Sequence, residues 1–153
     1  MLIKLINFGK DFQATPPMRN HYNDAGADVY AHIESHTCDY YEDLTVEVLP
    51  HTIRKIPLGF GLELLNGFVA FVVPRSGAST TKGITTEMVP IDSGYRGEIH
   101  AIVYNANDYP IRIANGDKIA QLVIVPVVLS DFTFDGQRER GDKAFGSSGY
   151  HKF

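Results

Sequence analysis

The stretch NGFVAFVVP, residues 66–74, decides how the rest of the sequence is interpreted. Its central residues, Phe68 to Val73, are all apolar and mostly β-branched or aromatic, and an Asn-Gly pair and a proline bound them. A short apolar run between such turn residues is typical of a strand, because a helix needs about ten or more residues. We therefore predict a β-strand over residues 68–73.

Short apolar segments of the same kind recur along the chain. They are LIKLINF (2–8), LTVEV (44–48), GLELL (61–65), EIHAIVY (98–104) and KIAQLVIVPVVL (118–129). This spacing is typical of an all-β protein. The Asn-Gly pairs at 66–67 and 115–116 predict tight antiparallel hairpins, since both residues tolerate positive φ. One short helix is predicted over Ser76 to Lys82, with a serine as its cap and Gly83 as its stop.

Length and composition predict one folded domain. The chain has 153 residues and a mass of 17.0 kDa, with 44% apolar and 21% charged residues, near the averages of globular proteins. No apolar run approaches the roughly 18 residues of a membrane span, and the N-terminal stretch has too short an apolar core for a signal peptide. We expect a cytoplasmic protein without a membrane partner, in agreement with its single cysteine, Cys38.

The charge of the chain argues against a nucleic-acid partner. A net charge of -4 is unfavourable for binding a nucleic-acid backbone, which usually needs a basic face. An anionic ligand would therefore require a few local cations or a metal ion.

Two polar segments interrupt the apolar pattern. Residues 32–44, HIESHTCDYYEDL, are predicted to be an exposed loop; their histidines and cysteine lack the second ligand pair of a zinc finger, so the loop is favoured over a metal site. Residues 137–153 are rich in charge, glycine and serine and predict a flexible C-terminal arm. The expected division is a β domain over residues 1–136 and an arm over residues 137–153.

The stretch VPIDSGYRGE, residues 89–98, places a carboxylate and an aromatic ring on one turn. Aspartate and glycine are ordinary turn residues, and a tyrosine can simply pack on a strand, so the turn alone favours a purely structural role. Asp92 and Tyr95 become candidate site residues only in combination with other segments.

Three other segments supply groups that suit a nucleotide. PRSGAS, residues 74–79, places Arg75 beside a serine hydroxyl and the N–H groups of a helix start, which suits a phosphate. Gln121 interrupts an apolar strand and needs hydrogen-bond partners, so we expect it to face a site. The arm carries Arg140, Phe145 and two serine hydroxyls among glycines, a combination that suits a base and its phosphates.

Together these segments resemble a known family. AGADVYA (25–31), PRSGAS (74–79), VPIDSGYRGE (89–98), GDKIAQL (116–122) and RGDKAFGSSG (140–149) are similar, in order and spacing, to the five motifs of the trimeric dUTP pyrophosphatase (dUTPase) family. The resemblance spans nearly the whole chain. It implies a jelly-roll-like β subunit and a homotrimer with active sites between subunits. It also implies Mg²⁺-dependent hydrolysis of dUTP to dUMP and pyrophosphate, which limits uracil in DNA and supplies dUMP for thymidylate synthesis.

The resemblance also implies roles for individual residues. Asp92 would deprotonate the water that attacks the α-phosphorus, and Tyr95 would exclude a 2′-hydroxyl beneath the deoxyribose. Asp28 would hold the Mg²⁺ shell through water, with the triphosphate as the main ligand. Phe145 would stack on uracil when the arm closes. The remaining substrate-binding residues would be Arg75, Ser76, Gly77, Gln121, Arg140, Gly146, Ser147 and Ser148.

The sequence departs from the family pattern at several places, of which the exchange of a common threonine for Ser148 is mild. Val89-Pro90 stands where the third motif usually begins with glycine, and Lys143-Ala144 replaces two glycines of the fifth motif. The first departure concerns the wall that faces the base, because proline lacks a backbone donor. The third departure is the long segment 32–44, either a tolerated surface insertion or a surface for a protein partner.

Two alternative functions remain open from the sequence. One is a dCTP deaminase or a bifunctional relative that shares the fold. The other is a dUTPase-like nucleotide-binding protein whose occupancy regulates a partner. The Asp-x-x-Tyr pattern of residues 92–95 favours the pyrophosphatase.

Overall fold

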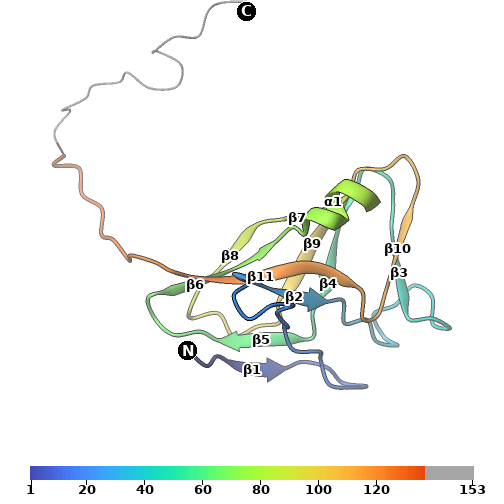
Figure 1. Cartoon of the computed structure of the whole chain (residues 1–153), viewed down its shortest axis with the longest axis horizontal. Helices are drawn as coiled ribbons and strands as arrows, with labels where there is room; N and C mark the ends of the chain where they lie inside the picture. Colours follow the sequence, from blue (N-terminus) through green and yellow to red (C-terminus); the bar gives the residue numbers. More distant parts are fainter. Residues whose placement is uncertain (137–153) are drawn as a thin grey trace, which may run out of the picture.

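The computed structural model describes residues 1–136, except for the side chains of residues 79–81. These residues form a β-rich body with one short helix (Figure 1). The elements are β1 (Lys4–Asn7), β2 (Gly26–Tyr30), β3 (Thr45–Val48), β4 (Ile53–Pro57), β5 (Phe60–Glu63), β6 (Phe68–Val73), α1 (Ser76–Lys82), β7 (Ile84–Glu87), β8 (Val89–Ile91), β9 (His100–Asn105), β10 (Ile111–Ala114) and β11 (Lys118–Pro126). The predicted all-β class is confirmed.

All strand pairs are antiparallel and join distant parts of the chain. The sheets have the orders β1-β5, β10-β3, β2-β11-β6-β8 and β4-β9-β7. Among the strands of residues 1–136, no two that are consecutive in the sequence pair with each other. This interleaving of strands gives the jelly-roll-like arrangement that the sequence analysis expected.

The predicted Asn-Gly hairpins are wrong. Gly67 and Gly116 do adopt the positive φ that such turns require, with values of 83° and 85°. However, β5 pairs with β1 while β6 pairs with β11 and β8, and β10 likewise belongs to a different sheet from β11. The two turns therefore carry the chain from one sheet to another.

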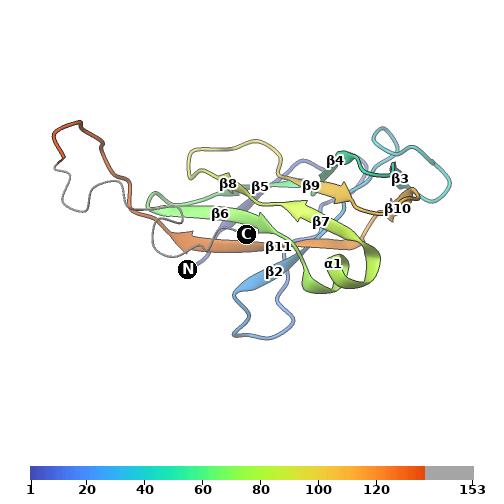
Figure 2. The ribbon, with the colours of Figure 1, turned by 90° about the horizontal axis from the view of Figure 1, so that it is seen from above.

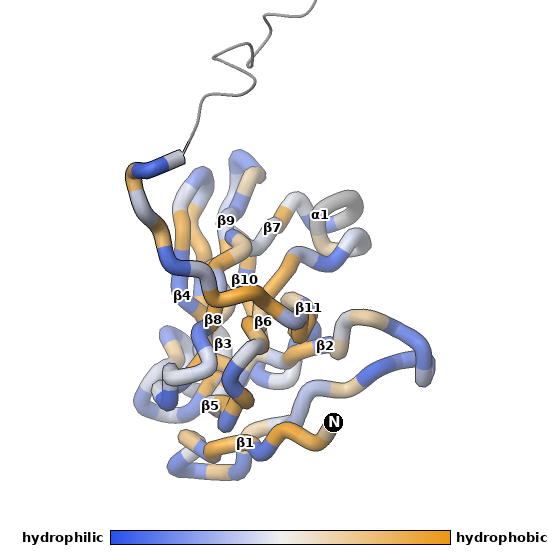
Figure 3. The backbone as a smooth tube through the Cα atoms, turned by 90° about the vertical axis from the view of Figure 1, so that its left-hand side faces the viewer, coloured by the Kyte–Doolittle hydropathy of each residue, from blue (hydrophilic) through white to orange (hydrophobic). Residues whose placement is uncertain are grey.

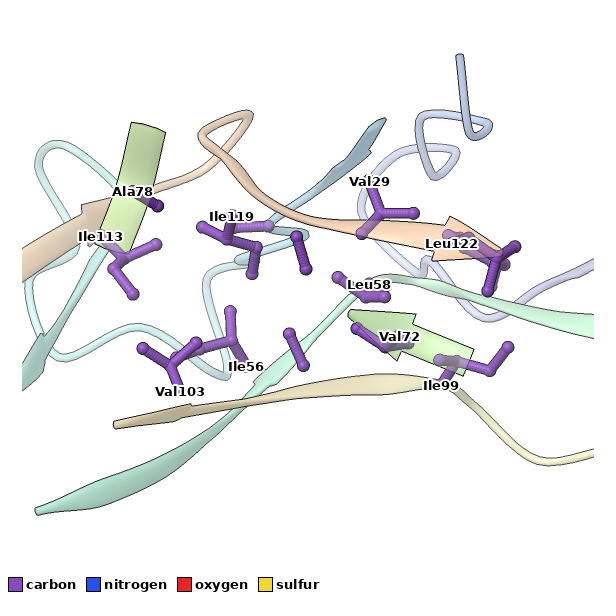
Figure 4. Packing of buried hydrophobic residues seen from close by; sticks show 14 of the residues in the cluster. Val29, Ile56, Leu58, Val72, Ala78, Ile99, Val103, Ile113, Ile119 and Leu122 are labelled. Atoms are coloured by element: carbon purple, nitrogen blue, oxygen red, sulfur yellow. The ribbon is translucent and has the colours of Figure 1, made fainter. Parts of the chain in front are cut away.

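The core lies between these sheets. Strand residues alternate between core and surface, as in β9, where Ala101, Val103 and Asn105 are buried and the residues between them are half-buried. Hydrophobic residues concentrate along the strands and hydrophilic ones along the loops (Figure 3). Side chains from β4, β6, β9 and β11 meet in the interior, including Ile56, Val72, Val103 and Leu122 (Figure 4).

The helix α1 has the predicted bounds but a different cap. Gly83 follows it in the left-handed conformation at φ 63°, as a stop signal should. The N-cap is Arg75 rather than a serine, and no side-chain cap hydrogen bond forms there. Ser76 is therefore the first residue of the helix, where its backbone N–H lies at the positive end of the helix.

The segment 32–44 is only partly the exposed loop that was predicted. His32, Ile33 and Glu34 are buried, whereas the residues from Ser35 to Asp43 are exposed, apart from the half-buried Cys38. Burial of Glu34 is possible because its Oε1 accepts the backbone N–H groups of Lys10 and Asp11 at 2.6 and 2.8 Å.

In the part of the chain that the structure describes, no helix is long and apolar enough to cross a membrane. The predicted arm over residues 137–153 lies outside the described residues, so the division into a β domain and an arm stays a prediction.

Candidate active site

The loop between β8 and β9 presents the two candidate residues of the third motif. It begins with a turn in which the backbone N–H of Tyr95 donates to the carbonyl of Asp92 at 3.0 Å. Asp92 is exposed, and Tyr95 is 48% exposed. The phenol of Tyr95 donates to the carbonyl of Glu98 at 3.0 Å, which fixes the direction of the ring. One turn thus holds a solvent-accessible carboxylate beside an oriented aromatic ring.

A pocket with a volume of about 270 Å³ opens beside this turn. Its lining includes Asp92 and Tyr95 and, from β8, Val89, Pro90 and Ile91. The departure from the family motif at 89–90 therefore forms part of the pocket wall. Among the described strands, β8 is the edge of its sheet, where proline is tolerated because one side of the strand is not paired within residues 1–136.

The strands on either side of the turn do not pair with each other in the described chain. Within the described ladders, β8 pairs with β6, and β9 pairs with β4 and β7. The separation of β8 from β9 leaves room for the pocket between them.

A second cluster forms around Asp28, whose carboxylate is only 1% exposed. Its Oδ1 lies 3.2 Å from Nε of Arg75 and accepts a hydrogen bond from Nε2 of Gln121 at 3.2 Å. Its Oδ2 lies 3.1 Å from Nζ of Lys118 and accepts from Nδ2 of Asn20 at 3.0 Å. The predicted first, second and fourth motifs therefore meet at one buried carboxylate.

The electrostatics of this cluster favour an ionised Asp28. Burial acts to raise the pKa of Asp28, but hydrogen bonds from Lys118, Gln121 and Asn20 and the charge of Arg75 outweigh it, so the pKa is lowered. The carboxylate in turn fixes the guanidinium of Arg75 and the amide of Gln121. Both groups are thereby pre-oriented beside the start of α1.

The start of α1 completes the second cluster. Ser76 and Gly77 are exposed in the first turn of the helix, and Arg75 directly precedes them. Nη1 of Arg75 also donates to the carbonyl of Lys118 at 3.0 Å, which ties the loop before the helix to β11. Donors of this kind, at a helix start and on arginine, suit a phosphate.

The two clusters lie at opposite ends of β6 within one chain. Ile91 pairs with Ala70, so the next residue, Asp92, stands near the N-terminal end of β6. Arg75 and Ser76, in contrast, follow the C-terminal end of β6. Asp92 follows opposite Val69, six residues before Arg75, which corresponds to roughly 20 Å at about 3.3 Å per residue of extended chain. Figure 2 shows the same relationship, with α1 beyond one end of β6 and the connection from β8 to β9 toward the other end.

Sequence reasoning missed four residues that organise these clusters. Lys118 and Asn20 bind Asp28, while Arg96 and Glu98 bind the backbone and phenol of the turn at 92–95. Lys118, Arg96 and Glu98 stand within quoted motifs, so their proximity to candidate residues was an available signal. Asn20 lies outside the motifs, and nothing in the sequence singled it out.

The candidate residues of the fifth motif lie outside the described residues. They are Arg140, Phe145, Gly146, Ser147 and Ser148. Their roles stay predictions.

A comparison with protein families decides the relationship of the chain. Residues 13–149 match the family model described as dUTPase. The chain belongs to the dUTPase family. It is 41% identical over 140 residues to a deoxyuridine 5'-triphosphate nucleotidohydrolase of Leifsonia xyli, covering 88% of this chain and 85% of that protein. It is 37% identical over 139 residues to one of Gloeobacter violaceus, covering 88% of both chains.

Solved dUTPase structures share the fold. The Staphylococcus bacteriophage 80alpha dUTPase with dUpNHpp matches with a TM-score of 0.78 and 28% identity, covering 97% of this chain and 99% of that one. A mutant dUTPase of phage phi11 of S. aureus, described with a structural Mg(II) ion, matches with a TM-score of 0.76 and 23% identity, covering 91% and 99%. The second likeness concerns the fold alone.

Proposed function

We propose that this chain hydrolyses dUTP to dUMP and pyrophosphate, with Asp92 as the general base for the attacking water. The observation that carries the proposal is the turn that presents Asp92 and Tyr95 in the lining of the pocket of about 270 Å³. Because the chain belongs to the dUTPase family, dUTP is the substrate that we propose for this site. In a cell the reaction would limit uracil incorporation into DNA and supply dUMP for thymidylate synthesis.

The pocket beside β8 would hold the base and the sugar. Uracil presents an N–H between two carbonyls, which backbone groups on the free edge of β8 can match, whereas cytosine reverses part of that pattern. Pro90 removes one donor from this wall, so the remaining backbone groups and the apolar side chains of Val89 and Ile91 must define the base site. Tyr95 would lie beneath the deoxyribose and leave no space for a 2′-hydroxyl.

The cluster around Asp28 would bind the phosphates. Arg75 and Gln121 are held by Asp28, and the start of α1 supplies Ser76 and Gly77. The fifth motif would close over the filled site, with Phe145 on uracil and Arg140, Gly146, Ser147 and Ser148 near the outer phosphates. Closure would exclude water from the site and complete the cationic surroundings of the triphosphate.

Mg²⁺ is the cofactor that we propose, and it would be held mainly by the triphosphate. The donor set around Asp28 is poorly suited to a direct metal ligand, because two cations and two amides already donate to its oxygens. A contact of Asp28 with the metal through water therefore stays a prediction. When bound, Mg²⁺ would neutralise charge on the phosphates.

The separation of the two clusters supports active sites between copies of the chain. Asp92 must lie close to the α-phosphorus, and the phosphate-binding groups must lie close to the adjoining phosphates. Within one chain, Asp92 is separated along β6 by roughly 13 Å from Gln121 and roughly 20 Å from Arg75. A site that combines Asp92 of one copy with Arg75, Ser76 and Gln121 of another removes the conflict.

The segment after β11 supports the same conclusion. It leaves the body as an extended chain (Figure 1) and carries several strongly exposed apolar side chains, among them Val128, Leu129 and Phe132 at 85%, 76% and 94% exposure. Apolar groups that project in this way are stabilised when another chain covers them. We propose the homotrimer that the family resemblance implies.

Pyrophosphate release tests the reaction. We expect Mg²⁺-dependent turnover of dUTP, with little turnover of dCTP, dTTP or UTP and loss of activity in EDTA. Ammonia release from dCTP would instead identify the deaminase. Tight dUTP binding without turnover would identify the regulatory alternative, and the exposed part of segment 32–44 would then be the place to search for a partner.

Mixing two inactive variants tests the shared site. Asp92→Asn removes the base, and Ser76→Asp repels phosphate while remaining compatible with the first turn of a helix. Co-refolded chains should recover activity in about a quarter of their sites if each site draws these residues from different copies at random. No recovery in verified mixed assemblies would contradict a site between copies. The doubly substituted chain, mixed with Asp92→Asn, is the matched control and should stay inactive.

A further inference from the structure

The turn that presents Asp92 and Tyr95 is held by a side chain that the proposed reaction does not use. Nη1 of Arg96 donates to the carbonyl of Ser93 at 2.6 Å and to the carbonyl of Tyr95 at 3.0 Å. The same atom lies 3.4 Å from the carbonyl of Leu62 in β5. One guanidinium nitrogen therefore links two carbonyls of the turn to a neighbouring strand.

This link matters because the turn has few other attachments among the described residues. Its internal backbone bond runs from Tyr95 to Asp92, and the hydroxyl of Ser93 donates to Oδ1 of Asn66 at a long 3.3 Å. The turn follows an edge strand and is exposed around Asp92. A charged donor makes stronger hydrogen bonds than a neutral one, and guanidinium stays charged at all working pH values.

The partner of Arg96 is a well-anchored strand. Leu62 is 1% exposed and pairs with Leu5 of β1. Further along the loop, the N–H of Ile99 donates to the carbonyl of Phe60 at 2.9 Å. Gly61 lies so close to the loop that a Cβ there would be 2.6 Å from the carbonyl oxygen of Gly97. Three consecutive residues of β5 thus contact the loop, and Arg96 makes the contact nearest the turn.

We propose that Arg96 is a positioning residue that fixes both Asp92 and Tyr95 through the carbonyls of the turn. This inference rests on the proposed function, because Asp92 and Tyr95 take their roles from it. In the described structure the guanidinium of Arg96 contacts the backbone carbonyls of Ser93, Tyr95 and Leu62, so it would act on the reaction through the turn. Its loss should therefore reduce two properties together: the turnover that depends on Asp92 and the preference for deoxyribose that depends on Tyr95.

The test compares Arg96→Met, which keeps most of the volume but has no donors, with Arg96→Lys, which keeps the charge but not the fork of donors. For Arg96→Met we expect kcat on dUTP to fall about 10²-fold, because misplacement by about 1 Å has effects of that size. The ratio of kcat/KM for dUTP over UTP should fall about tenfold in the same variant. Arg96→Lys should be intermediate in both, and neither variant should unfold at the assay temperature.

Arg54 offers the matched control. Its guanidinium also donates to a backbone carbonyl, that of Glu47 at 2.6 Å, and pairs with Asp39, but these residues do not line the pocket beside the turn. Arg54→Met should leave both kcat and the dUTP/UTP ratio unchanged. Thermal unfolding of each variant separates loss of positioning from loss of fold.

The outcomes separate this inference from the proposed function. Absence of dUTP turnover in the unmodified chain would contradict the proposed function. The dissociation constants of dUpNHpp and its ribonucleotide counterpart would then still measure whether Arg96 controls sugar preference. An Arg96→Met variant that keeps both properties would overturn the positioning role. A variant that loses kcat but keeps the sugar preference would also overturn it, since a direct phosphate contact would explain that pattern. If Arg96→Met does not fold, kcat on dUTP and the dUTP/UTP ratio of kcat/KM, measured in Arg96→Lys, test the positioning role instead.

Discussion

The ring of Tyr95 lies against Gly97 so closely that an ideal Cβ on residue 97 would be 2.6 Å from Cζ of Tyr95. Gly97 does not adopt a positive φ, so its backbone conformation does not require glycine. What requires glycine is the space that the phenol occupies while it donates to the carbonyl of Glu98. The orientation of the Tyr95 ring, which we propose to contact the sugar, therefore depends on the absence of a side chain at residue 97.

Gly97→Ala should displace this ring without a backbone penalty. We expect the dUTP/UTP ratio of kcat/KM to fall about tenfold, equivalent to about 1.4 kcal/mol, because Tyr95 can no longer exclude the 2′-hydroxyl as tightly. Steady-state kinetics on both substrates measure this ratio. Gly94→Ala is the control in the same turn, because a Cβ there meets no atom within 4 Å in the described chain. An unchanged ratio in Gly97→Ala would remove Tyr95 from the sugar site.

Asp92→Asn should separate binding from chemistry. The amide keeps the size of the side chain but cannot accept a proton from water, so kcat should fall by about 10²- to 10⁴-fold while dUpNHpp still binds. Calorimetry and single-turnover kinetics measure the two properties. Asp108→Asn is the control, since that carboxylate pairs with His51 on the surface. Turnover at the unmodified rate would show that Asp92 is not the base.

Local sequence signals predicted the elements but not their partners. The Asn-Gly pair and Pro74 gave the correct bounds of β6, and Gly83 gave the correct end of α1. The same Asn-Gly signal failed to predict pairing, because it determines the backbone conformation of a turn and not the sheet that the next strand joins. In this chain the pairing depends on which apolar faces meet in the core, and these come from distant segments.

Hydrogen bonds between distant residues could not be predicted from the sequence either. Glu34 was predicted to be exposed, yet it is buried because N–H groups more than twenty residues earlier donate to it. Asp92 and Ser76 were correctly expected on a turn and at a helix start. Their separation along β6 follows from the pairing of β8 with β6, which no short motif encodes. The distance between Asp92 and Ser76 therefore could be seen only in the structure.

Glu34 predicts a pH-dependent stability. Burial acts to raise the pKa of Glu34, but hydrogen bonds from the N–H groups of Asp11, Lys10 and Phe12 and the imidazole of His32, whose Nε2 lies 3.2 Å from Oε1, outweigh it, so the pKa is lowered. A lowered pKa stabilises the folded state above the unfolded value of about 4.3, and this contribution is lost as the pH falls through the folded pKa. His36 also faces the carboxylate, with its Nε2 3.7 Å from Oε2.

Glu34→Gln should therefore destabilise the protein at pH 7 by about 1–3 kcal/mol, since it loses hydrogen bonds to a charged acceptor. The difference from the unmodified chain should shrink as the pH falls below about 4.3. Urea unfolding at a fixed protein concentration, repeated from pH 7 down to pH 3.5, measures both effects. Glu63→Gln is the control, because Glu63 pairs only loosely with Lys4, at 4.0 Å. A difference that stayed constant across this range would contradict the lowered pKa.

Asp28→Ala should destabilise the protein. It would remove the buried acceptor of Arg75 and Lys118, but their side chains are 30% and 40% exposed, so water screens the charges that remain and the cost should be about 1–3 kcal/mol. Adding Lys118→Met to Asp28→Ala should recover part of the loss, because it removes one of the uncompensated cations. Urea unfolding of the single and double variants measures the recovery, and no recovery would show that the charges are not coupled.

The Mg²⁺ concentration for half-maximal turnover, measured in Asp28→Asn, distinguishes two possible roles of this carboxylate, a contact with the metal through water and the anchoring of Arg75 and Gln121. An increased requirement would support a metal contact through water, and an unchanged requirement would leave Asp28 as the anchor of Arg75 and Gln121.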